Sequence, residues 1–181
     1  MQTLEQQMSV YGAYHRDVRN RATHFVGVPV IIFALLVALG WLRLNILGIG
    51  LSGAMLFVTI VHAYYFRLDA ALAAAMTIFT LVLLYFSEQI AQLPFVQSFT
   101  IFLVLFIGGW ILQLVGHYFE GRKPALVDNF FQVFVAPLFL MAEVFFAFGW
   151  KPALRARVEH LVESRMEMHG KQPMDDRQAI A

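Results

Sequence analysis

Apolar residues occur along this chain in long runs that short polar turns separate. Each of the first four runs has about the 20 residues that an α-helix needs to cross roughly 30 Å of hydrocarbon. The fifth run contains Gln132, Pro137 and Glu143, so it predicts either a further span or a broken helix buried among the others. The predicted segments are residues 25–42, 46–66, 70–90, 95–119 and 130–150.

The two ends of the chain are polar but keep helical patterns. Residues 4–20 predict an amphipathic helix, and the charged stretch 151–169 predicts another. The whole pattern predicts an all-α fold, a polytopic integral membrane helical bundle of four to five spans with polar N- and C-terminal helical segments. We expect residues 1–150 to form a single membrane-embedded domain and residues 151–181 to form a polar, charged tail. In the N-terminal helix, one stripe along the helix surface is formed by Leu4, Met8, Tyr11 and His15.

Composition agrees with a membrane protein and excludes several chemistries. The chain is 60% hydrophobic and 14% charged, against about 25% charged residues in soluble domains. Its net charge of +1 argues against a nucleic-acid partner, because binding to phosphates needs a basic surface. The absence of cysteine excludes disulfides, thiolate metal sites and cysteine nucleophiles. Any metal would therefore be held by His, Asp, Glu or backbone oxygen.

Basic residues mark alternate ends of the predicted spans. The positive-inside rule places these ends in the cytoplasm, and four histidines lie at them. We expect an integral membrane protein with its site at the cytoplasmic face, in the inner or plasma membrane of a bacterium or the endoplasmic reticulum of a eukaryote. The basic residues are Arg16, Arg19, Arg21, Arg67, Arg122 and Lys123. The histidines are His15, His24, His62 and His117.

The end of the fourth run carries a polar face. Gln113, His117 and Glu120 are spaced i, i+4 and i+7, so an amide, an imidazole and a carboxylate lie on one side of a helix. Polar groups at the end of a membrane-length helix are costly and usually functional. We therefore predict that this helix face forms one wall of a functional site.

His15 and His24 reach such a site only if the chain bends between them. Nine residues separate them, which is half a turn around a continuous helix, and Asn20 is a candidate N-cap for a new helix. Imidazoles bind Fe(II), Zn(II) and Cu(II), and a ligating imidazole needs a partner on its other ring nitrogen. The candidate partners are Asn20, Gln113, Asn129, Gln132 and Glu143.

Simpler interpretations stay open from the residues alone. An imidazole at a span end, His62 above all, often bonds to headgroups or backbone at the interface, and Glu143 is as well suited to a structural bond as to a direct role. His160 and His169 fit a solvated surface. The chain as a whole is also compatible with a non-enzymatic transporter or scaffold whose polar residues join helices, or with a bis-His haem protein.

Two sequence blocks resemble the membrane 2-hydroxy fatty acid dioxygenase (Mpo-like) family, long catalogued as a domain of unknown function. The resemblance runs from about residue 11 to residue 150 and leaves out the charged tail. The first block is Tyr11-x-x-Tyr14-His15-x-x-x-x-Asn20-x-x-x-His24-x-x-Gly27-x-Pro29. The second is Gln113-x-x-Gly116-His117-x-x-Glu120-x-Arg122-x-Pro124-Ala125-Leu126-x-x-Asn129-x-x-Gln132, followed by Ala136-Pro137-x-Phe139 and Glu143.

The resemblance implies a non-haem Fe(II) dioxygenase of fatty acid α-oxidation that does not use 2-oxoglutarate. Such an enzyme uses O2 to convert a 2-hydroxy fatty acid to the acid one carbon shorter, releasing CO2. An α-hydroxy carboxylate can chelate iron through both oxygens, and O2 can take an open position. Residues 1–150 would be the catalytic domain, in contact with membrane lipid, and a homo-oligomer stays open.

The resemblance also implies roles for single residues. His15, His24 and His117 are the expected iron ligands. His62 is a fourth candidate from sidedness alone. His117, Glu120 and His24 are the expected catalytic residues, with Glu120 either a ligand or a partner of one. From their position alone, and not from the resemblance, Arg122 or Lys123 is expected to steer the substrate carboxylate at the interface.

Overall fold

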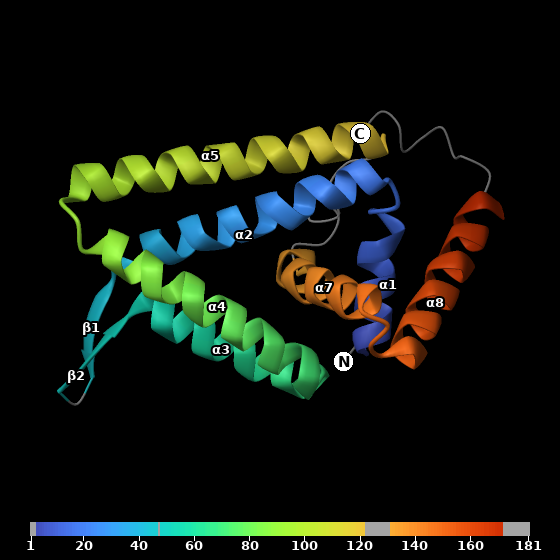
Figure 1. The fold of residues 1–181 in the computed structure, drawn as a ribbon, viewed down its shortest axis with the longest axis horizontal. Helices are drawn as coiled ribbons and strands as arrows, with labels where there is room; N and C mark the ends of the chain where they lie inside the picture. Colours follow the sequence, from blue (N-terminus) through green and yellow to red (C-terminus); the bar gives the residue numbers. More distant parts are fainter. Residues whose placement is uncertain (1–2, 47, 122–130, 172–181) are drawn as a thin grey trace.

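A computed structural model describes residues 3–46, 48–121 and 131–171, and it has the predicted all-α architecture (Figure 1). Three helices in this part of the chain are long and apolar enough to cross a membrane, and two apolar helices are shorter, at 16 residues each. The long helices are α2 (Val18–Gly40), α4 (Ala70–Ala91) and α5 (Phe95–Glu120). The shorter apolar helices are α3 (Gly53–Leu68) and α7 (Gln132–Ala147), and the polar helices are α1 (Leu4–Ala13) and α8 (Pro152–Lys171).

The predicted bend between His15 and His24 is confirmed, but its cap is Asp17 rather than Asn20. The Asp17 carboxylate accepts a hydrogen bond from Arg19 N at 2.8 Å and so caps the first turn of α2. Asn20 already lies inside that turn, fully buried. Since α2 begins earlier than the apolar run, Pro29 lies in the helix interior and not in its first turns.

A β-hairpin replaces the predicted start of the second span. Strands β1 (Arg43–Ile46) and β2 (Ile49–Ser52) pair antiparallel, with Gly48 in the left-handed region at φ 82°. The carboxylate of Glu88 in α4 ties the hairpin to the bundle, since it accepts from Arg43 Nη1 at 2.6 Å and from Ser52 Oγ at 2.5 Å. Ser52 then caps α3 by accepting from Met55 N.

The longest helices, α2 and α5, lie side by side, with α3 and α4 forming a second pair (Figure 1). Small residues let α2 and α5 approach closely, because Gly27 faces Gly109, and Gly116 faces Asn20 and Thr23. Helix α7 packs between α1 and α4 and supplies much of the buried apolar core.

Helix α8 packs along α1 rather than standing apart as a tail. Leu154 and Val158 of α8 join the core cluster with Leu4 and Met8 of α1. Arg157 also pairs with Glu5 of α1 at 3.1 Å. Both apolar and charged contacts therefore hold the two polar helices together.

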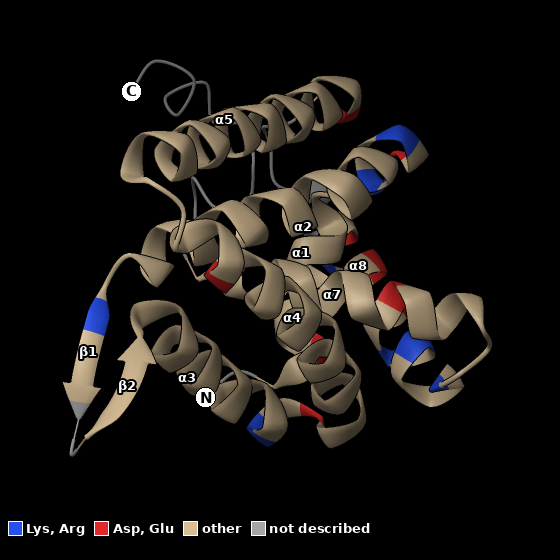
Figure 2. Cartoon of the chain, turned by 60° about the vertical axis from the view of Figure 1, so that its left-hand side comes forward, with Lys and Arg blue, Asp and Glu red and all other residues tan. Residues whose placement is uncertain are grey.

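Charged residues gather at the ends of the apolar helices and on α8. In Figure 2, α5 is coloured as uncharged residues along almost its whole length, with an acidic residue only at one end. Helix α4 carries only Glu88 and α3 only Arg67, each near the C-terminal end. Such apolar middles with charged ends are typical of membrane helices.

Candidate metal centre

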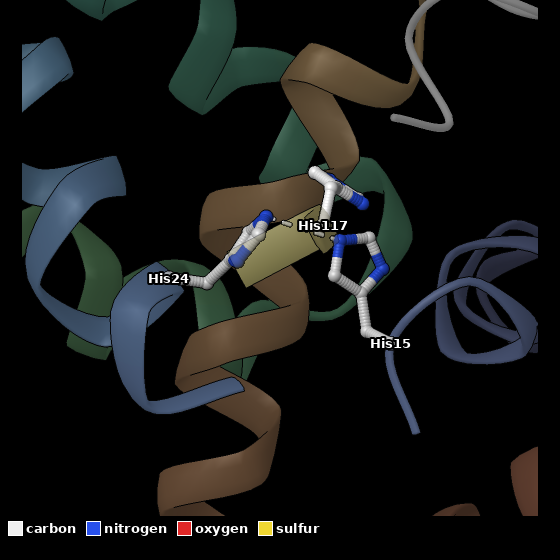
Figure 3. Close-up of side chains that lie close together, drawn as sticks. All are labelled: His15, His24 and His117. Carbon is white, nitrogen blue, oxygen red and sulfur yellow. Dashed lines mark hydrogen bonds between the residues drawn. The ribbon is translucent and has the colours of Figure 1, made fainter. Parts of the chain in front are cut away.

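Three of the predicted histidines meet where α1, α2 and α5 converge. His15 comes from the α1–α2 connection, His24 from the second turn of α2, and His117 from the last turn of α5. Ring nitrogens of the three lie within 4.8 Å of one another. The side chains are only 4%, 4% and 6% exposed, and Figure 3 shows the imidazoles pointing toward one another.

The backbone fixes the tautomer of two of these rings. Nδ1 of His15 lies 2.7 Å from the carbonyl of Tyr11, and Nδ1 of His24 lies 2.8 Å from the carbonyl of Asn20. A carbonyl oxygen can only accept, so each Nδ1 carries the proton and each Nε2 keeps a lone pair. Carbonyl partners of this kind are usual for metal-binding histidines.

These lone pairs make the cluster suitable for a cation. Nε2 of His15 and Nε2 of His24 are 3.1 Å apart, and two lone pairs at that distance repel unless a positive charge lies between them. Burial, with a smaller effect from the neighbouring His24, lowers the pKa of His15 to about 3. His15 is therefore neutral near pH 7, which is the form that binds metals.

Tyr11 orients His15 from two directions. Besides offering its carbonyl to Nδ1, it stacks its ring on the imidazole with centroids 3.9 Å apart and an interplanar angle of 8°. In the sequence, Tyr11 stood out as part of a helical stripe and of the first family block, without a role of its own. Its position four residues before His15 was the signal that it could hold that ring.

The predicted acidic residues lie beside the histidine cluster and have other partners. Glu120 accepts hydrogen bonds from Arg16 N and Asp17 N of the α1–α2 connection and from Asn20 Nδ2 in the first turn of α2, at 2.8 to 3.1 Å. Glu143 pairs with Arg21 at 3.1 Å. Neither carboxylate is part of the cluster formed by His15, His24 and His117.

Among the other predicted site residues, His62, Gln113 and Gln132 line the same cavity as the histidine cluster. His62 is buried but outside the cluster itself. Asn129, Arg122 and Lys123 lie outside the described residues, so their predicted roles stay predictions.

The cavity measures about 420 Å³ and is mainly apolar. It reaches from the three histidines between α2, α3, α4, α5 and α7. A nonpolar chain could lie in it with its head at the histidines, since apolar burial favours such a chain over water. Its apolar lining includes Ile31, Leu35, Phe57, Val61, Phe106 and Trp110.

Comparison with known proteins agrees with this geometry. A family model described as 2-hydroxy-palmitic acid dioxygenase Mpo1-like matches residues 1–148. The chain is 33% identical over 162 residues to the 2-hydroxy-palmitic acid dioxygenase MPO1 of Saccharomyces cerevisiae, covering 88% of this chain and 90% of the yeast protein. No solved structure matches the chain. The matched region holds all three clustered histidines, and the chain belongs to the Mpo1-like family.

Proposed function

We propose that this protein is a membrane Fe(II)-dependent dioxygenase of fatty acid α-oxidation. It converts a 2-hydroxy fatty acid and O2 to the acid one carbon shorter, CO2 and water, without 2-oxoglutarate. The observation that carries the proposal is the buried cluster of His15, His24 and His117 at one apolar cavity. Family membership and the name of the yeast relative support the same substrate class.

The donor set fits iron. His15, His24 and His117 would hold Fe(II), which imidazoles bind well, and the ion would offer its remaining coordination positions to oxygen ligands. When bound, iron supplies the Lewis acidity and the one-electron chemistry that O2 requires. The usual non-haem site has two histidines and a carboxylate. Here a third imidazole takes the place of that carboxylate, and Glu120 supports the chain that carries His15.

The rest of the chain binds and orients the substrate. The cavity holds the acyl chain among apolar side chains from α2, α3, α5 and α7. Burial of the histidines keeps bulk water away from the reacting carbon. At the cytoplasmic face, Arg122 or Lys123 attracts the carboxylate as the substrate enters, and Asn129 supports the site.

Metal content and O2 consumption of the purified full-length protein test this proposal. We expect close to one iron per chain, and O2 uptake with 2-hydroxyhexadecanoate when Fe(II) is supplied. His24→Ala and His117→Ala should each lower iron to background, because removing one of three ligands leaves too few donors. His160→Ala is the control, since that imidazole lies exposed on α8. Wild-type protein without iron, or without O2 uptake, would refute the proposal.

A further inference from the structure

His62 has an unused hydrogen-bonding atom in the cavity. Its Nδ1 lies 2.9 Å from the carbonyl of Val58, so that nitrogen donates and Nε2 keeps a lone pair. The side chain is 7% exposed, and Nε2 has no hydrogen-bond partner among the described residues. The neighbouring Tyr65 does not supply one, because its hydroxyl donates to the carbonyl of Phe134. A buried polar atom without a hydrogen-bond partner destabilises the folded protein unless a bound ligand supplies that partner.

Two amides share the cavity with His62 and also have unused atoms. Gln113 Nε2 and Gln132 Oε1 are buried without a hydrogen-bond partner in the described part of the chain. Both residues line the same cavity. Besides the histidine cluster, the cavity lining therefore offers one donor, Gln113, and two acceptors, Gln132 and His62. A 2-hydroxy acid carries the matching groups, since its hydroxyl donates and its carboxylate accepts.

We propose that His62 determines specificity for the 2-hydroxyl group, by accepting a hydrogen bond from it at Nε2. A carboxylate has no proton to give a neutral imidazole, so the hydroxyl is the substrate group that this atom recognises. The Gln113 amide donates to the substrate carboxylate. His62 is then a substrate-binding residue and not a fourth metal ligand, in agreement with its position outside the clustered nitrogens. This inference rests on the proposed function and extends it to the choice of substrate.

The test compares the binding of 2-hydroxyhexadecanoate and hexadecanoate to the full-length protein, without O2, by titration calorimetry in detergent. We expect the wild-type protein to prefer the 2-hydroxy acid by about tenfold or more, which is a common value for one buried hydrogen bond. His62→Leu should reduce this preference by about tenfold, the share that one buried hydrogen bond contributes, while keeping iron content and the affinity for hexadecanoate. His62→Gln, whose amide lies near the Nε2 position, should keep part of the preference. His160→Leu, on the exposed face of α8, should keep all of it.

The outcomes separate the two proposals. If the wild-type protein shows no preference and no turnover, both the function and this inference fail. If the wild-type protein turns over the 2-hydroxy acid but His62→Leu keeps the preference, only the inference fails. Loss of iron in both His62→Leu and His62→Gln would instead make His62 a ligand and would also overturn the inference.

Discussion

At the scale of single residues, the most connected group beside the cluster is the Glu120 carboxylate. It joins the end of α5 to the turn that carries His15, through two backbone amides and the Asn20 side chain. Hydrogen bonds to charged groups contribute about 1.5–3 kcal/mol each when buried, and less where water competes. Glu120 therefore acts on the position of His15.

We predict that Glu120→Ala destabilises the fold by about 1–3 kcal/mol even when no metal is present, because three donors lose their acceptor. The measurement is thermal unfolding in detergent, with and without Fe(II). Glu120→Gln keeps one acceptor oxygen and should lie between the wild type and Glu120→Ala. An unchanged stability of the metal-free Glu120→Ala protein, together with lost iron, would instead identify Glu120 as a ligand.

The sequence predicted which residues face the site better than it predicted their partners. Helical spacing placed Gln113, His117 and Glu120 on one face, and sidedness brought His15 and His24 to the same end. Spacing within a helix gives a direction, but it does not tell which neighbouring backbone lies there. The amides that bind Glu120 come from a turn about a hundred residues earlier, and their position follows from the packing of α2 on α5.

At the scale of elements, the contact between α2 and α5 sets the distance between His24 and His117. A methyl group at Gly116 would lie 2.5 Å from Asn20 Oδ1 and would also clash with Thr23 Oγ1 and crowd His24 Nδ1. Only a hydrogen atom fits there. The position of Gly116 next to His117 therefore brings the two histidine-bearing helices close enough to share an ion.

We predict that Gly116→Ala costs about 1–3 kcal/mol, the usual range for overpacking, and weakens iron binding by moving the two helices apart. Gly108→Ala in the same helix is the matched control. A Cβ there meets nothing within 4 Å, so it should stabilise α5 by about 0.5–1 kcal/mol. Chemical unfolding and iron titration measure both effects. Equal effects of the two substitutions would contradict the close packing.

Hydropathy predicted two of the three long helices well, placed the start of α2 too late, and missed the hairpin. Segments 70–90 and 95–119 match α4 and α5 within a residue at each end. The hairpin strands are only four residues each, and β2 is continuous with the apolar run that becomes α3. Glu88, which ties the hairpin to the bundle, is distant in the sequence, so this contact could not be read from a local pattern.

At the scale of the whole molecule, an apolar bundle is closed at its histidine end by two polar helices. Helix α8 lies beyond the region that the family model matches. It nevertheless covers α1, the helix that leads into His15, and Arg165 Nε bonds to Ser9 Oγ at 2.9 Å across that contact. The position of the histidine cluster should therefore depend on α8.

We predict that deleting residues 152–181 lowers stability by about 3–6 kcal/mol, because Leu154 and Val158 are lost from the core. Iron should also dissociate faster, since α1 is then less firmly held. Thermal unfolding and the rate of iron loss to a chelator are the measurements. Deletion of residues 172–181 alone, which keeps α8 whole, is the control. Unchanged iron retention without α8 would show that α1 is held by the bundle alone.

The separation of the three histidines along the chain has a consequence during synthesis. His15 and His24 are made first, and His117 follows roughly 90 residues later, which takes about 5 to 20 s on the ribosome. Two of the three imidazoles are therefore present on the nascent chain before His117 has been synthesised. If the proposed iron site is correct, all three imidazoles can hold the ion only after α5 has packed beside α2, so metal capture would coincide with the completion of the bundle.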